Sequence, residues 1–366
     1  MTQAKSKPKT QSKTQSKTKS KPGNTASTAG TMFHKVALGV VVAGAAGMFA
    51  IGIATFDGAP APQGDTRQAA AGAVSSDGRT VVRFAVDPAD PVRAAAKIGK
   101  PAKITLANST GKLWELFREI GYEIDGVRTH GEVPRLFLAS LPEDLRKLRV
   151  VSKRKITFIK STLPLILHVN ELILQDRKRL KSIFALTENG TNLTPLDKIW
   201  LEEISELYGA DGADPIVLLK RVDIIPPSLA IAQAAEESGW GTSRFAREGN
   251  ALFGQRAYKA SKKGIVPHER EDGKAFKVRA FDHLIDGVKA YAHNLNSHFA
   301  YKDFRAARAE MRANSGQVEG YRLAGALMRY SERGADYIST IRLIMRANTL
   351  KVFDGARLGN KIDPGA

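Results

Sequence analysis

Two adjacent carboxylates, Glu236 and Glu237, stand at the end of an alanine-rich segment and could carry out acid chemistry. Residues 227–241 open with proline and close on glycine, which predicts a helix of about three turns. The negative end of the helix macrodipole disfavours an anion in the last turn, so it raises the pKa of a carboxyl group there. Burial beside an aromatic side chain such as Trp240 would raise that pKa further. An acid that stays protonated near neutral pH can protonate the leaving oxygen of a glycoside.

A pair of glutamates at a helix end is more often a solvated surface feature than a catalytic one. The residues around this pair favour the catalytic interpretation. Residues 225–241, which end in Glu237-Ser-Gly-Trp-Gly241, resemble the signature of the glucosaminidase family of bacterial autolysins and flagellar peptidoglycan hydrolases, and in particular its Bax-type branch. The resemblance extends over residues 145–350 and continues, in order, through Asn250-Ala-Leu-Phe-Gly254, residues 281–291, Asn294-Leu-Asn296 with Ala300-Tyr301, and Tyr330-Ser-Glu-Arg-Gly334 with Tyr337.

The resemblance implies an α+β, predominantly α fold: a lysozyme-like, mostly helical catalytic domain with a small β-lobe beside the cleft. It also implies cleavage of a β-1,4 glycosidic bond next to N-acetylglucosamine in peptidoglycan. The family's acid corresponds to Glu237, and the family's tyrosine motif places Tyr337 in the cleft, where it orients the substrate. Glu236 occupies a position that is often apolar in the family, and we expect it to be exposed or at the edge of the groove.

A second catalytic group is expected downstream, because the family takes it from the β-lobe. Here that region is His268-Glu-Arg-Glu-Asp-Gly273, in which three carboxylates compete. Glu269 and Glu271 are the favoured candidates, since Asp272-Gly273 has the composition of a turn. All three could instead lie on a solvated hairpin. A carboxylate pair about 5 Å apart would indicate retention and a wider pair inversion, and some enzymes use the acetamido group of the substrate instead.

Other residues of these motifs are candidates for substrate contact. Trp240, Phe253 and Tyr330 could stack on sugars or pack in the core, and packing is the interpretation we favour for Phe253. Asn250 could hold the N-acetyl group or cap a turn. By its spacing alone, Tyr337 would be a core aromatic at the start of a helix with Ile338, Ile341, Ile344 and Met345.

Helix signals surround the motif segment. Thr194-Pro195 and Asp214-Pro215 each combine an N-capping side chain with a proline in the first turn, and the two helices should end at Gly209 and before Pro226. Residues 156–174 carry apolar side chains at helical spacing, with Pro164 as a kink or break. Weaker patterns predict a helix over residues 113–120 and short strands over 80–86 and 136–139.

The N-terminal region has the composition of a membrane anchor. Residues 1–35 contain eight lysines and no Asp, Glu or Arg, and we expect a disordered cytoplasmic tail. Residues 36–55 carry no charge and are long enough to cross a hydrocarbon core of about 30 Å as one helix. Positive-inside logic then places all that follows in the periplasm, outside the inner membrane. The alternative is a signal peptide cleaved near Ala59-Pro-Ala61.

The remaining divisions follow from composition. Residues 56–78 form a linker, 79–144 a small α/β spacer, 145–350 the catalytic domain with a helical extension, and 351–366 a tail. The net charge is +19, of which +11 lies beyond residue 35, and it could attract stem-peptide carboxylates or acidic lipid headgroups. The basic runs at 153–155 and 177–179 have the character of solvated faces. Peptidoglycan strands are the expected partner, and nucleic acid is not.

The sequence lacks the motifs of several other kinds of enzyme. The chain has no cysteine, phosphate-binding Gly-rich loop, serine elbow or His-Glu-x-x-His helix, and its seven histidines form no cluster. We therefore expect neither a metal nor another cofactor. Because a fold does not fix a function, the competing hypothesis is a non-catalytic peptidoglycan-binding or scaffold protein on the same fold.

Overall fold

The computed structural model describes residues 104–105, 108–257, 263–267 and 277–359. This part of the chain is predominantly helical, and its strands are only two or three residues long, as the sequence predicts. The expected basic tail, the apolar segment 36–55, the linker and the strand at 80–86 lie outside the described residues.

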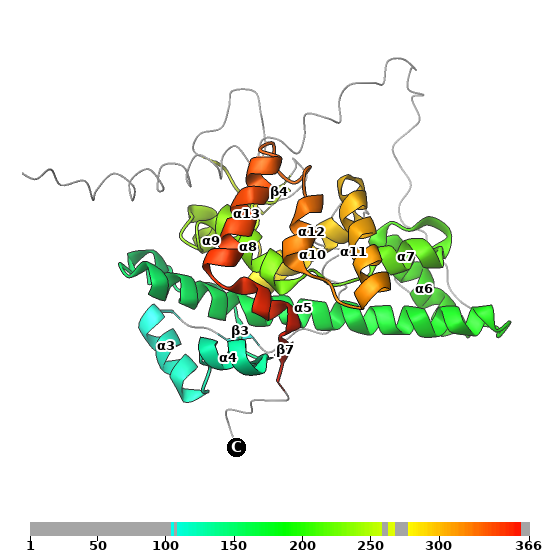
Figure 1. Ribbon diagram of the computed structural model, residues 1–366, viewed down its shortest axis with the longest axis horizontal. Coiled ribbons are helices and arrows are strands. Elements are labelled where there is room, and N and C mark those ends of the chain that lie inside the picture. Colours follow the sequence, from blue (N-terminus) through cyan, green and yellow to red (C-terminus); the bar gives the residue numbers. More distant parts are fainter. Residues whose placement is uncertain (1–103, 106–107, 258–262, 268–276, 360–366) are drawn as a thin grey trace, which may run out of the picture. The chain divides into compact units, whose positions relative to one another are not determined.

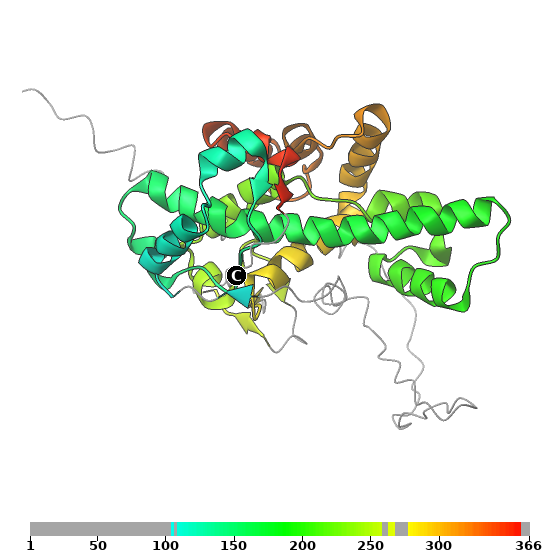
Figure 2. The same cartoon turned by 90° about the horizontal axis from the view of Figure 1, so that it is seen from below.

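The longest helix is α5, Val151–Glu188, the long green helix of Figures 1 and 2. Side chains all around its middle turns are buried, including Leu163, Leu165, Ile166 and Leu167, which is typical of a central core helix. Within the described residues, α5 is long and apolar enough to cross a membrane, but 83% of its most apolar stretch is buried inside the protein. We therefore assign α5 to the core.

α5 continues through Pro164, so of the two alternatives, a kink or a break, the break is wrong. A proline inside a helix removes one backbone hydrogen bond and costs about 3 kcal/mol. Here Pro164 is buried in the part of α5 that packs against α8, Pro227–Ser238, and α10, Leu284–Ser297. Burial of this turn offsets the lost bond.

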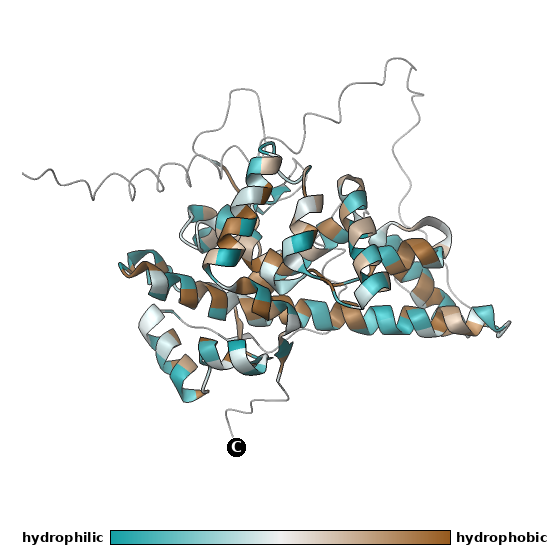
Figure 3. Ribbon diagram, in the orientation of Figure 1, coloured by the Kyte–Doolittle hydropathy of each residue, from teal (hydrophilic) through white to brown (hydrophobic). Residues whose placement is uncertain are grey.

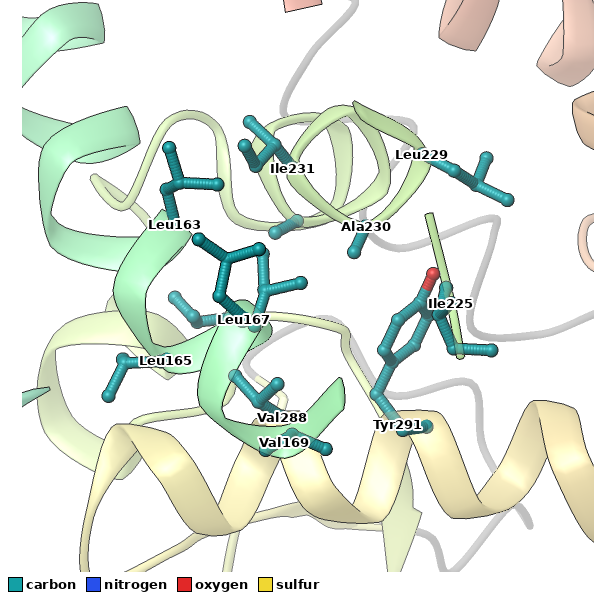
Figure 4. Packing of buried hydrophobic residues seen from close by; sticks show 14 of the residues in the cluster. Leu163, Leu165, Leu167, Val169, Ile225, Leu229, Ala230, Ile231, Val288 and Tyr291 are labelled. Carbon is teal, nitrogen blue, oxygen red and sulfur yellow. The ribbon is translucent and has the colours of Figure 1, made fainter. Parts of the chain in front are cut away.

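The core lies where α5, α8 and α10 meet (Figure 4). α13, Ala335–Ala347, packs on the other side of α8, and the 3₁₀ helix η5, Leu350–Gly355, also contacts α8. The side chains that fill the centre of this cluster are Leu163, Leu165, Leu167, Val169, Ile225, Leu229, Ala230, Ile231, Val288 and Tyr291.

Further helices extend the core along the second half of α5. They are α6, Pro195–Tyr208; η2, Asp211–Ala213; α7, Pro215–Arg221; η3, Phe299–Tyr301; α11, Lys302–Ser315; α12, Gly320–Leu323; and η4, Ala324–Ala326. The predicted N-caps are confirmed, because Thr194 accepts from the Asp197 amide and Asp214 from the Ile216 amide. Gly209 ends α6 in the left-handed conformation.

Residues 108–144 pack against the first half of α5 and contribute side chains to the same buried cluster. They contain α3, Thr110–Glu119, and α4, Ile124–His130, followed by η1, Glu143–Lys147. Two parallel strand pairs join distant parts of the chain: β1, Ile104–Thr105, with β3, Phe137–Leu138, and β2, Glu132–Val133, with β7, Arg357–Leu358. The indole of Trp114 donates to Thr157 at 2.9 Å, which ties α3 to α5.

A small antiparallel sheet follows α9, Arg244–Gly249, in the region where a β-lobe was predicted. β6, Lys277–Arg279, is its central strand and pairs with β4, Arg256–Ala257, and β5, Gly264–Ile265. Phe281, just after β6, donates its amide to the carbonyl of Gly249 at 2.8 Å. The sheet is thereby held to the end of α9, close in sequence to the Asn250-Ala-Leu-Phe-Gly254 motif.

Candidate active site

α8 positions the candidate acid. Pro226 and Pro227 start the helix, and Gly239 ends it with φ 58°, in the left-handed region that favours glycine. Every residue from Pro227 to Ala235 is buried, so the alanines allow α5, α13 and η5 to approach closely. Glu236 and Glu237 lie in the last turn, as the sequence predicts.

The Glu237 side chain is partly buried, and its two carboxyl oxygens have different neighbours. Oε1 accepts a hydrogen bond from the Tyr337 hydroxyl of α13 at 3.0 Å. Oε2 faces the backbone of Gly254, since a Cβ added to that glycine would lie 3.7 Å from it. The motif segment before β4 therefore closes one side of the carboxyl group.

A directed chain of hydrogen bonds continues from Tyr337. The Gln233 side-chain amide donates to the Tyr337 oxygen at 2.9 Å, and the Tyr291 hydroxyl donates to Gln233 Oε1 at 2.6 Å. Because Gln233 donates to Tyr337, the Tyr337 proton is left to point at Glu237. Three helices, α8, α10 and α13, thus fix the orientation of the carboxyl group.

Aromatic rings enclose this chain. Tyr330 stacks on Tyr337 with centroids 5.3 Å apart, and Phe253 stacks on Tyr291 at 3.8 Å. Tyr301 lies 6.0 Å from Tyr330 in a tilted arrangement. These rings exclude water from the inner side of Glu237 and bring no positive charge to it.

Burial raises the pKa of Glu237 from its ordinary value of 4.5 to about 8. The hydrogen bond from Tyr337 opposes this rise, the charge of Glu236 adds to it, and Arg333 lowers it again. Glu237 is therefore mostly protonated at neutral pH. Trp240 packs edge-on against Phe158 of α5, with the Lys155 ammonium 4.8 Å from its ring centroid.

Glu236 is not an exposed residue, which was one of the two expected alternatives, and a place at the edge of the groove stays a prediction. Its side chain is 17% exposed and forms an ion pair with Arg333 at 2.8 Å. Arg333 also donates to Thr340 of α13 at 2.7 Å. The reason is that the Tyr330–Gly334 motif brings Arg333 over the end of α8. The two neighbouring glutamates thus occupy separate environments, one paired with a cation and the other with a phenol.

The other sequence candidates pack around this centre. Asn250 ends α9 in the left-handed conformation (φ 51°), and its amide donates to the carbonyls of Phe281 and Asp282 at 3.2 and 3.0 Å. This arrangement corresponds to the second of the two roles considered for Asn250, the capping of a turn. Phe253 is buried, which is the packing alternative, and Tyr330 is buried against Tyr337.

Three predicted carboxylates cannot be placed in the structure, and two residues of the site were not predicted from the sequence. Glu269, Glu271 and Asp272 lie outside the described residues. Gln233 and Tyr291 were missed, although Gln233 lies four residues before Glu237 and so on the same face of the helix. In the part of the chain that the structure describes, no group of three or more His, Asp and Glu side chains could hold a metal ion.

Comparison with known proteins agrees with the motifs. Residues 215–350 match the family model described as glucosaminidase, mannosyl-glycoprotein endo-beta-N-acetylglucosaminidase. The chain is 34% identical to Protein bax of Escherichia coli (strain K12) over 205 residues, which span 54% of this chain and 71% of that protein. No solved structure matches the chain significantly.

Proposed function

Since this chain belongs to the Bax-type branch of the glucosaminidase family, we propose that it is a glycoside hydrolase acting on peptidoglycan. The bond we assign to it is a β-1,4 linkage next to N-acetylglucosamine, cleaved within the strand by general acid catalysis. The observation that carries this proposal is the buried carboxyl group of Glu237, whose pKa of about 8 keeps it protonated at neutral pH.

In the proposed mechanism, Glu237 protonates the glycosidic oxygen. Because Tyr337 donates to Oε1, the acidic proton belongs on Oε2, the oxygen that faces Gly254. As the proton leaves, the carboxylate that forms keeps the hydrogen bond from Tyr337, which stabilises it. Gln233 acts on Tyr337 only, by directing its hydroxyl proton toward Glu237. It is a positioning residue.

The second carboxylate is proposed to be Glu269 or Glu271, in the connection between β5 and β6. A separation from Glu237 of about 5 Å would produce retention, through attack on the sugar, and a wider separation would produce inversion through a water molecule. The stereochemistry of the product, read by proton NMR, distinguishes these routes. Substitution of each glutamate by glutamine identifies the one that acts.

The residues that contact the substrate are proposed from the side chains that surround Glu237 and follow α8. Trp240 and Tyr330 are candidates for sugar stacking, and each also packs in the protein. Asn250 and Phe253 hold the segment 250–254 beside Glu237, and Asn250 is also a candidate for contact with the N-acetyl group. We further propose that residues 145–350 form a lysozyme-like domain.

The location is also proposed. Residues 36–55 would cross the inner membrane once, with residues 1–35 in the cytoplasm and the catalytic domain in the periplasm. Tethering of this kind would confine hydrolysis to the inner face of the wall. A protease added to the outside of spheroplasts should then digest the catalytic domain and leave the N-terminal tail intact.

The hydrolase proposal is tested with the full-length chain in detergent and purified peptidoglycan. New reducing ends are identified by mass spectrometry of the released fragments. Glu237→Gln should nearly abolish release, while the neighbouring Glu236→Gln, which makes the same carboxyl-to-amide change, should retain it. Fragments that do not end in N-acetylglucosamine would reject the proposed linkage. A folded wild-type chain that binds glycan without releasing fragments would reject hydrolysis itself.

A further inference from the structure

One end of α5 carries a cluster of cations that the proposed catalytic machinery does not use. We define the basic tip as the ten residues 146–155, which contain six basic side chains and no acidic one. They are Arg146, Lys147, Arg149, Lys153, Arg154 and Lys155. Between them stand Val150 and Val151, which are 60% and 50% exposed. The tip therefore combines strong positive charge with two neighbouring apolar side chains open to solvent.

The cations of the basic tip have no acidic partner among the described residues. Arg154 donates to the carbonyl of Leu148 at 3.1 Å. Lys153 and Lys155 lie over the rings of Trp114 and Trp240, 5.0 and 4.8 Å from their centroids. These contacts orient the side chains but do not pair them with a carboxylate, although Glu143 and Asp144 precede the tip in η1.

The other basic run of α5, at residues 177–179, illustrates basic side chains that stabilise the packing of helices. Arg177 donates to backbone carbonyls of α7 and its C-cap, including that of Val222 at 2.8 Å. Arg179 pairs with Asp197 at 3.1 Å and covers the ring of Trp200. These two arginines hold α6 and α7 against α5. In the basic tip, at the opposite end of the same helix (Figure 1), Lys153 and Lys155 also cover aromatic rings, but among the described residues no cation of the tip pairs with a carboxylate as Arg179 does.

The placement of these charges also opposes stability. The first turn of α5 contains no acidic residue, and cations there face the positive end of the helix macrodipole. Neighbouring cations repel one another, and burial together with the charge of Arg154 lowers the pKa of Lys155. The exposed valines add nothing to the core. The arrangement becomes favourable only when an anionic partner with an apolar layer covers it.

We propose that the basic tip docks on an anionic phospholipid surface. Lysine and arginine side chains next to a bilayer are attracted to acidic headgroups, while small apolar side chains enter the boundary with the acyl chains. A carboxylate-bearing polymer would match the cations but not the adjacent valines. Figure 3 shows this end of α5 mostly in the teal of hydrophilic residues, with the brown of hydrophobic residues at its start. Because Lys155 contacts Trp240, docking would fix the orientation of the end of α8 relative to the bilayer.

The absence of cysteine in the chain permits a direct test. Val150→Cys is labelled with an environment-sensitive fluorophore in the full-length chain, which is reconstituted into vesicles of phosphatidylglycerol and phosphatidylcholine that carry a spin-labelled quencher lipid. Val352→Cys, at a 40% exposed valine of η5, is the matched control. The label at residue 150 should be quenched at least about threefold more than that at residue 352, and vesicles of phosphatidylcholine alone should remove the difference.

Two further experiments distinguish an effect of charge from an effect of misfolding, and a lipid surface from another anionic partner. Arg146→Gln, Lys147→Gln and Arg149→Gln together should reduce quenching at residue 150 to the control level, and high salt should do the same to the chain that keeps these cations. Equal quenching at residues 150 and 352, or quenching that neither treatment changes, overturns the proposal. Protection of the label by soluble polyglutamate in neutral vesicles would assign the tip to an acidic polymer. None of these readouts depends on hydrolysis.

Discussion

Two carboxylates close to α8 illustrate opposite uses of burial. Asp223, in the loop before α8, accepts two hydrogen bonds from Arg312, at 2.8 and 3.0 Å, and lies 3.7 Å from Arg177. Burial alone would raise its pKa, but the arginine hydrogen bonds and charges lower it. Glu237, at the other end of α8, accepts only from a neutral phenol, and burial raises its pKa to about 8.

The difference lies in the partners rather than in the carboxyl groups. Arg308, which is fully buried, donates to the carbonyls of Asp223 and Ile224 and to Asn296 Oδ1, so the cluster around Asp223 joins α7, α10 and α11. An acid that is paired with several cations in this way stabilises the fold. An acid surrounded by tyrosines keeps its proton at neutral pH and can give it away.

The largest effect should come from Glu237→Gln. Removal of the acidic proton should lower peptidoglycan hydrolysis by about 10³-fold, since a positioned acid contributes roughly 10²- to 10⁴-fold. The variant should unfold at or above the temperature of the wild-type chain, because no buried charge loses its partner. Loss of folding together with activity would instead place Glu237 in the same class as Asp223.

The converse variant is Asp223→Asn. It leaves Arg312 and Arg177 without their anion, and removal of one partner of a buried ion pair costs about 3 to 5 kcal/mol of unfolding free energy. Denaturant titration measures this loss. Hydrolysis per folded molecule should stay close to wild type, and a fall in that quantity with unchanged stability would contradict the assignment.

Stability should respond to pH with opposite signs at the two sites. The folded chain holds the Glu237 proton more tightly than the unfolded chain, so this contribution to stability is complete below the ordinary pKa of 4.5 and is lost as pH rises through about 8. Relative to the wild-type chain, Glu237→Gln should gain on the order of 3 kcal/mol between about pH 5 and about pH 9. The lowered pKa of Asp223 contributes stability that is lost only as the solution becomes acidic.

A smaller effect is expected for Tyr337→Phe. The Tyr337 hydrogen bond lowers the pKa of Glu237, so its removal should raise that pKa and reduce hydrolysis by about tenfold. Gln233→Leu, which removes the donor that orients Tyr337 and the acceptor of the Tyr291 hydroxyl, should have a weaker effect of the same kind. If Tyr337→Phe changed substrate binding alone and left the pH profile unchanged, its contact with Glu237 would be without consequence for the acid.

Local signals predicted much of the fold. Proline, cap and glycine signals located α6, the start of α7 and both ends of α8, and they placed Glu237 in a final turn. A break at Pro164 was one of two alternatives and is wrong, because a local rule for proline does not include the packing that surrounds the middle of α5.

The site was less predictable, because its contacts join residues far apart in the chain. Tyr337 and Glu237 are 100 positions apart, and Tyr291 and Gln233 are 58 apart. No periodicity indicates that Arg333 pairs with Glu236 or that Tyr337 donates to Glu237. Helical spacing could have indicated Gln233, which shares a face with Glu237.

The pH dependence of kcat/KM for peptidoglycan hydrolysis tests the central claim most directly, because it reports the pKa of the acid in the free enzyme. The protonated Glu237 assigned here predicts activity that is retained at neutral pH and lost with an apparent pKa of about 8. Tyr337→Phe should move that loss to higher pH. A loss of activity near the ordinary glutamate pKa of 4.5, or a profile that Tyr337→Phe leaves unmoved, would contradict the assignment of Glu237 as the buried, protonated acid.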